Sequence, residues 1–94
     1  MHDPHVDPAA MRARAAAIRL NAESLRALGE RLDRRVDGLV YEGPAAVRFR
    51  AAAVERSHRT RGAVRELDRM ADRLQHEATR AEQQLADGRP HGGV

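Results

Sequence analysis

The chain has 94 residues, which is enough for one small domain, and 33% of them are charged, with a formal net charge of +3. Leucine, isoleucine, valine and phenylalanine total 17 residues, whereas alanine alone accounts for 18. So few large apolar side chains do not fill a self-sufficient core, and we therefore expect a partner chain. The absence of cysteine excludes a disulfide, and no apolar run is long enough to predict a transmembrane helix.

The first helix is predicted over residues 8–40, after a flexible polar tail over residues 1–7 that lacks the features of a Sec signal peptide. Asp7 can cap the helix, and Pro8 suits its first position. Apolar and small residues then alternate in steps of four and three, which is typical of helix bundles and excludes a strand. This seam contains Met11, Ala15, Ile18, Ala22, Leu25, Gly29, Leu32, Val36 and Leu39.

A sharp turn is predicted over residues 41–43. Gly43 can adopt a positive φ and can cap a following helix, and Pro44 lacks an N–H that the first helical position leaves unpaired. Tyr41 and Phe49, the only two aromatic residues, flank this turn. We expect both rings to pack there and to fix how the helices meet.

The second helix is predicted over residues 44–86. Its seam contains Phe49, Val64, Leu67, Leu74 and Leu85 among smaller residues. No large apolar side chain occurs from Glu55 to Gly62, and we predict a kink or frayed turn at Gly62.

The predicted fold is all-α, a single antiparallel helix-turn-helix hairpin domain over residues 8–87, with a flexible tail over residues 88–94. Two helices cover only one side of each other, so we expect the hairpin to pair with a second hairpin into a four-helix bundle. The predicted partner interface consists of Met11, Ile18, Leu25, Leu32, Val36, Leu39, Val64, Leu67, Leu74 and Leu85.

The stretch from Tyr41 to Phe49 resembles the central motif of the WXG family of type VII secretion substrates, the early-secreted-antigen-like proteins. That motif has an aromatic residue, glycine at +2, small residues at +4 and +5, and often an aromatic residue at +8. The matching residues here are Tyr41, Gly43, Ala45, Ala46 and Phe49. Tyrosine stands in place of the usual tryptophan. The resemblance covers residues 8–86.

The resemblance implies a non-enzymatic protein without a cofactor that forms a homodimer or heterodimer with another helical hairpin, either itself or a WXG-like paralogue. It also implies a type VII secretion substrate, co-secreted partner or adaptor, handled by the secretion machinery or joined to a larger secreted effector. The family's export signal, a tyrosine followed four residues later by Asp or Glu, is missing from residues 76–94. We therefore expect secretion by a non-Sec type VII route together with a partner, or a cytoplasmic location before export.

Arginine dominates the charge pattern, since all 17 basic side chains are arginine and none is lysine, as is typical of a high-GC genome. Residues 44–65 carry a balance of +5, and residues 66–87 carry −3. The basic run from Arg48 to Arg65 has three interpretations: a solvated face, a surface for an acidic partner protein, or a surface for nucleic acid. The alternative function is therefore an intracellular Arg-rich helical protein that binds nucleic acid or regulates a complex, although aromatic stacking groups are lacking.

No catalytic, cofactor-binding or metal site is predicted. Glu55 and His58 form a Glu-x-x-His motif of the kind found in di-iron bundles, but Arg56 crowds it with positive charge. Ser24 and Ser57 have no activating base suggested by the sequence.

Overall fold

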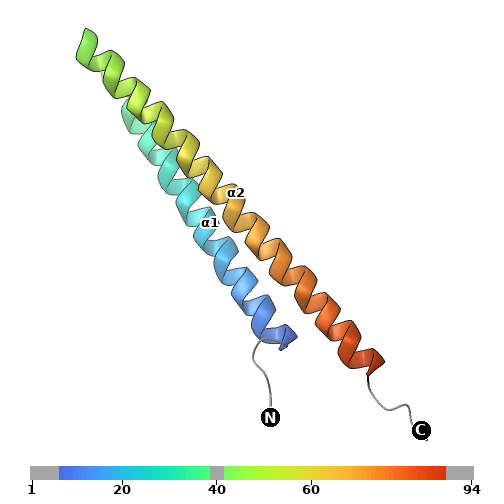
Figure 1. Cartoon of the computed structure of the whole chain (residues 1–94). Coiled ribbons are helices and arrows are strands. Elements are labelled where there is room, and N and C mark those ends of the chain that lie inside the picture. Colours follow the sequence, from blue (N-terminus) through green and yellow to red (C-terminus); the bar gives the residue numbers. More distant parts are fainter. Residues whose placement is uncertain (1–6, 39–41, 89–94) are drawn as a thin grey trace, which may run out of the picture.

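The structure, a computed structural model, describes residues 7–38 and 42–88. Two long helices, α1 over Pro8–Asp37 and α2 over Pro44–Asp87, run antiparallel beside each other (Figure 1). These described residues contain no strand, which confirms the predicted all-α hairpin. The principal extents of 80 × 19 × 15 Å are those of a rod with two helices in its cross-section. The four-helix bundle stays a prediction.

The start of α1 is as predicted. Oδ1 of Asp7 accepts a hydrogen bond of 3.0 Å from the N–H of Ala9, and Pro8 occupies the first turn. The helix ends at Asp37, earlier than the predicted limit at residue 40, and Gly38 forms its C-cap by donating to the carbonyl of Arg34. Glycine has a low helix propensity, which accounts for the early end.

Gly43 has φ 95° and ψ −175°, and it is the one residue with positive φ in the described part of the chain. Its carbonyl accepts hydrogen bonds from the N–H groups of Ala46 and Val47 at 3.1 and 3.2 Å, so it caps α2 through its backbone. Pro44 occupies the first turn of α2, where an N–H group would have no hydrogen-bond partner within the helix, so the lack of one in proline costs nothing. The predicted role of the glycine is confirmed, whereas Tyr41 lies outside the described residues.

The predicted kink at Gly62 is wrong, because α2 runs unbroken for 44 residues and ends one residue after the predicted limit. The segment without large apolar residues is held to α1 by small and polar ones. Thr60 packs against Gly29, and the Ser57 hydroxyl donates to Asp33 at 3.2 Å. At about 1.5 Å per residue α2 is longer than α1 by roughly 20 Å, and its first turns continue past the end of α1 (Figure 1).

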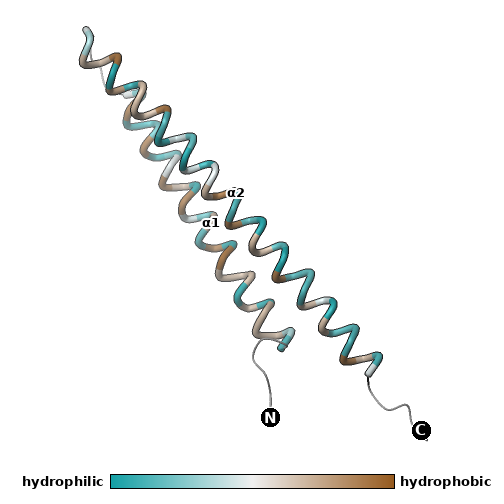
Figure 2. The backbone as a smooth tube through the Cα atoms, in the orientation of Figure 1, coloured by the Kyte–Doolittle hydropathy of each residue, from teal (hydrophilic) through white to brown (hydrophobic). Residues whose placement is uncertain are grey.

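The core between the two helices is made of small side chains. Apolar residues recur at intervals along both tubes in Figure 2, but those that are fully buried are almost all alanine. The buried residues, each at most 9% exposed, are Ala15, Ala22, Ala46, Ala53, Val64, Ala71, Ala78 and Ala81. A buried methyl group contributes only about 0.8 kcal/mol, so this core brings the helices close while contributing little free energy.

The surface area also indicates an incompletely buried chain. The accessible surface is 7538 Å², whereas a compact monomer of this mass exposes about 5400 Å². Large apolar side chains that the alanine core leaves exposed contribute to this surface.

Candidate partner-binding interface

One flank of the alanine core carries polar contacts between the helices, and we call this flank the polar face. Along this flank the residue numbers of the contacts rise in α1 as they fall in α2, as antiparallel packing requires. The pairs are Arg12–Glu82, Arg19–Asp72 at 3.0 Å, Arg26–Asp68 at 3.5 Å and Ser57–Asp33 at 3.2 Å. Exposed ion pairs such as Arg19–Asp72 contribute about 0.2–1 kcal/mol each, so they set register more than stability.

Four large apolar residues of α1 lie on the opposite flank. Each one directly precedes a residue of the polar face, and one step along a helix turns the side chain by about 100°. Ala15 and Ala22 lie between the two rows and are buried against α2. The apolar row consists of Met11, Ile18, Leu25 and Leu32, which precede Arg12, Arg19, Arg26 and Asp33.

The same order holds in α2. Leu67 precedes Asp68 of the polar face, and Phe49 precedes Arg50, which lines a groove there together with Asp33. In an antiparallel pair, matching flanks of the two helices fall on the same side. We therefore define the apolar face as Met11, Ile18, Leu25, Leu32, Phe49, Leu67 and Leu74.

The residues of this face are incompletely covered by the hairpin. Phe49 is 41% exposed, and the others are half-buried. Apolar surface on both helices of one face is typical of a protein–protein interface. The part of each side chain that the hairpin leaves exposed is available to a partner.

The remaining residues of the predicted partner interface fall elsewhere. Val64 is 6% exposed and belongs to the core between α1 and α2, so it offers a partner little surface. Val36 is half-buried and continues the row of Ala15 and Ala22, and Leu85 is 52% exposed near the end of α2. Leu39 lies outside the described residues. The interface as a set stays a prediction.

The predicted turn motif is brought together only in part. Ala46 is 2% exposed, whereas Gly43, Pro44 and Ala45 are exposed. Phe49 takes its place on the apolar face. The predicted packing of Tyr41 stays a prediction.

A groove of about 390 Å³ lies on the polar face over Gly29 and Thr60. The short side chains at these two positions leave the space. Its charged lining contains three arginines and three carboxylates, Arg26, Arg61, Arg65, Glu30, Asp33 and Asp68. Because the signs balance, the groove favours neither an anion nor a cation.

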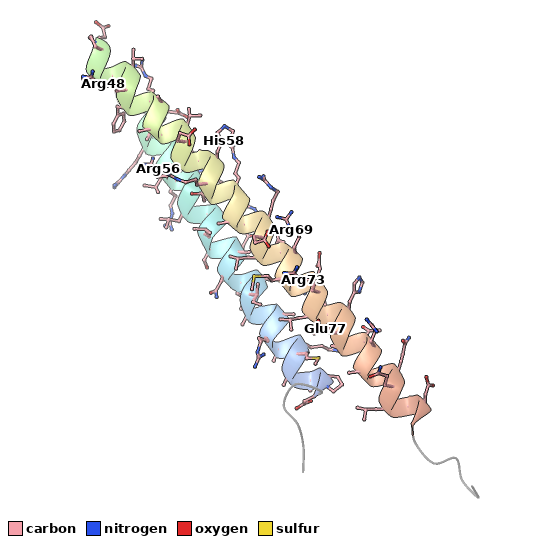
Figure 3. All side chains as sticks on the ribbon, viewed as in Figure 1. Arg48, Arg56, His58, Arg69, Arg73 and Glu77 are labelled. Carbon is pink, nitrogen blue, oxygen red and sulfur yellow. The ribbon has the colours of Figure 1, made fainter. Side chains whose placement is uncertain are left out.

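The basic run predicted from Arg48 to Arg65 is mostly on the surface. Arg48 lies on the part of α2 that continues past α1 (Figure 3), and Arg59 and Arg61 are exposed as well. Arg56 differs, because it is half-buried and its Nη2 atom is buried without a hydrogen-bond partner in the described part of the chain. The sequence placed Arg56 in the basic run and between Glu55 and His58, and its partial burial was not predicted.

The cross-helix ion pairs were also missed by the sequence analysis. Arg12, Arg19 and Arg26 repeat at intervals of seven beside the apolar row, and this repeat is the signal that could have found them. A shorter-range pair, Arg69 with Glu66, lies along α2 itself. The hydrogen bond from Arg69, followed by its positive charge, lowers the pKa of Glu66.

No three His, Cys, Asp or Glu side chains within residues 7–38 and 42–88 are grouped to hold a metal ion, and this includes Glu55 and His58. Neither α1 nor α2 contains a stretch that is apolar enough to cross a membrane. What the described surface offers is therefore an apolar face on a thin helical hairpin.

Comparison with known proteins agrees with this architecture. The family model WXG100, described as proteins of 100 residues with WXG, matches residues 5–86 and so spans both helices and the turn. No curated protein and no solved structure matches the chain. Tyr41-Glu42-Gly43 stands at the place of the motif that names the family. The chain belongs to the WXG100 family of helical hairpin proteins.

Proposed function

We propose that the chain is a non-enzymatic pairing protein that forms a four-helix bundle with a second hairpin through its apolar face. The observation that carries this proposal is that the alanines and the large apolar residues occupy different positions on the hairpin. Alanine joins α1 to α2, whereas large side chains such as Leu25 and Leu67 remain half-buried on one face. Burying such a side chain fully contributes about 1.5–3 kcal/mol, which is more than an alanine contact provides.

We further propose that the bundle is handled by a type VII secretion system, as substrate, co-secreted partner or adaptor. Membership of the WXG100 family, whose members are non-enzymatic secreted hairpins, supports this assignment. The export unit is the bundle and not the single hairpin, because pairing covers the apolar face before the chain meets the machinery.

The alternative, an Arg-rich protein that binds nucleic acid, has less support. Arg61 and Arg65 of the basic run line the groove of the polar face together with Glu30, Asp33 and Asp68, so their charge is balanced locally. Nucleic-acid binding requires a continuous basic surface with free charges.

Co-purification from the native cell tests the pairing. A tagged chain should retain one further protein of about a hundred residues with hairpin character, identified by mass spectrometry. Leu25→Arg on the apolar face should abolish retention, whereas Leu20→Arg, at a position that is 70% exposed, should leave it intact. Equal retention by both variants would contradict a role of the apolar face.

A secretion assay tests the export. The tagged chain should appear in the culture filtrate of the native cell and should disappear from it when the type VII ATPase is deleted. Leu25→Arg should also stay inside the cell, although it is synthesised at the wild-type level. Release that does not depend on the ATPase would contradict the proposed route.

A further inference from the structure

Arg56 carries a buried nitrogen for which the chain supplies no acceptor. Its Nη2 atom is buried, and no group in residues 7–38 or 42–88 accepts a hydrogen bond from it. Figure 3 shows this side chain where α2 runs beside α1. A guanidinium is charged at every accessible pH and only donates hydrogen bonds, so a buried donor of this kind is unfavourable until an acceptor is provided.

Arg56 lies on the apolar face. It directly precedes Ser57, whose hydroxyl bonds to Asp33 on the polar face, just as Leu67 precedes Asp68. It also follows Phe49 by seven residues, which is about two turns of the helix. The surface that a partner covers therefore contains one arginine among large apolar side chains.

The acceptor that matches a desolvated guanidinium best is a carboxylate, because it is charged and can accept two parallel hydrogen bonds. The carboxylates that form ion pairs or hydrogen bonds within residues 7–38 and 42–88 have their partners elsewhere. Asp33, Asp68, Asp72 and Glu82 belong to the polar face, Glu23 and Glu66 pair along their own helices, and Asp7 caps α1.

A second copy of the chain matches this face poorly. It would bring another Arg56 into the interface and add a second positive charge. Its nearest candidate acceptor on the same side of α2 is Glu77, which is exposed and lies 21 residues further on. That spacing is about 31 Å along the helix.

We propose that Arg56 is the residue that determines which partner is accepted, and that it selects a different helical hairpin with a carboxylate on its own apolar face. This inference rests on the pairing proposed above. Arg56 opposes self-association, because a homodimer brings two half-buried guanidinium charges into one interface without an acceptor. The heterologous partner supplies one acidic side chain at the level of Arg56 and thereby converts the unfavourable group into a specific contact.

Sedimentation of the purified chain tests the first half of the proposal. Arg56→Leu removes the charge and continues the apolar row, so it should lower the dissociation constant of the homodimer about tenfold or more, which is 1.4 kcal/mol. Arg59→Leu, one turn further on and exposed, is the matched control and should change it less than about twofold. A higher dissociation constant for Arg56→Leu would overturn the proposal. If Glu77→Gln and Arg56→Leu raised the dissociation constant of the homodimer equally, the acceptor would be Glu77 of a second copy.

A carboxylate scan tests the second half. The probe is a second copy of this chain with one acidic substitution on the apolar face, Ile18→Glu, Leu25→Glu, Leu67→Glu or Leu74→Glu. Immobilised wild-type chain should capture at least one of these copies about tenfold more tightly than immobilised Arg56→Gln does, which is a difference of 1.4 kcal/mol. Equal capture of all four copies by both chains would overturn the selection of a carboxylate.

The two proposals fail in different ways. If Leu25→Arg leaves the retention of the native partner unchanged, the apolar face is not a pairing surface and the proposed function fails. If Leu25→Arg abolishes that retention while Arg56→Leu leaves self-association unchanged, pairing stands and only the selective role of Arg56 is wrong. Circular dichroism of each variant checks that the helices are retained.

Discussion

Gly29 of α1 and Thr60 of α2 meet so closely that a Cβ atom on residue 29 would lie 3.0 Å from Cγ2 of the threonine. No larger residue fits at position 29 without moving its neighbour. This contact lies in the segment of α2 where the sequence offers no large apolar side chain. There the two helices pack closely through small residues, and no large side chain fills the space between them.

The contact between Gly29 and Thr60 predicts a coupled pair of mutations. In a Thr60→Ser background the methyl group is gone, and Gly29→Ala should raise the free energy of unfolding by about 0.5–1 kcal/mol through helix propensity. In the wild-type background the close contact should cancel this gain. Urea unfolding at one fixed protein concentration measures both effects. Equal effects in the two backgrounds would show that the residues do not touch.

Leu25→Ala should weaken pairing. The side chain is half-buried in the hairpin and becomes fully buried in the proposed bundle, so the loss should be about 2 kcal/mol or roughly 30-fold in the dissociation constant. Leu20→Ala removes the same atoms from a position that is 70% exposed and serves as control. Analytical ultracentrifugation compares the two, and similar dissociation constants would argue against the apolar face.

Gly43→Ala should destabilise the hairpin by about 1–3 kcal/mol through backbone strain, because φ 95° is rarely adopted by L-residues. Steric collision with the described residues is not the cause, since apart from the adjacent Glu42 and Pro44 none of their atoms lies within 4 Å of the added Cβ. Gly43→Asn should not rescue stability, because ψ −175° lies far from the left-handed helical region that asparagine tolerates. A D-alanine introduced at residue 43 by chemical ligation should be tolerated. Thermal melts that rank L-alanine and D-alanine equally would contradict the strain.

Gly62→Ala should stabilise the chain by about 0.5–1 kcal/mol, because α2 is a regular helix there and glycine costs conformational entropy. Beyond the adjacent residues and the helix's own backbone, the described part of the chain places only the flexible Arg65 guanidinium within 4 Å of the added Cβ, at 3.9 Å. Chemical unfolding followed by circular dichroism provides the measurement. A loss of stability would indicate that α2 bends at Gly62 in solution, as the sequence had suggested.

Arg19 and Asp72 should show a small coupling energy. Both side chains are substantially exposed, and a double-mutant cycle to alanine should give about 0.2–1 kcal/mol at low salt. The coupling should shrink in 1 M NaCl, where the screening length falls to about 3 Å. Arg19 with Glu23, four residues apart on α1, is the control pair for which we expect less coupling.

Local signals accounted for most of the fold. Asp7 and Pro8 predicted the start of α1, and Gly43 with Pro44 predicted the start of α2, because caps and proline act within a few residues. The predicted kink at Gly62 was wrong because bending depends on contacts between residues that are far apart in the sequence. Whether a weak segment bends depends on what lies across from it, and the sequence does not show that Gly29 faces Thr60.

The candidate partner interface was predicted less well from the sequence than the fold was. A heptad seam identifies which residues face inward but does not say which of them face the neighbouring helix and which face a partner. Val64 was therefore assigned to the partner interface, although it lies in the core between α1 and α2. Arg56 was assigned to a basic surface, and its burial follows only from the side-by-side packing of the helices.

The junction at Gly43 and Pro44 also limits how two copies of the chain can exchange helices. The ring of Pro44 disfavours a helical conformation at the preceding residue, and φ 95° at Gly43 lies outside the helical region. An open form in which α1 and α2 join into one continuous helix, the usual intermediate of domain swapping in helical hairpins, is therefore unfavourable. We therefore expect each hairpin of the proposed bundle to be closed on itself, so that one partner can be replaced by another without unfolding.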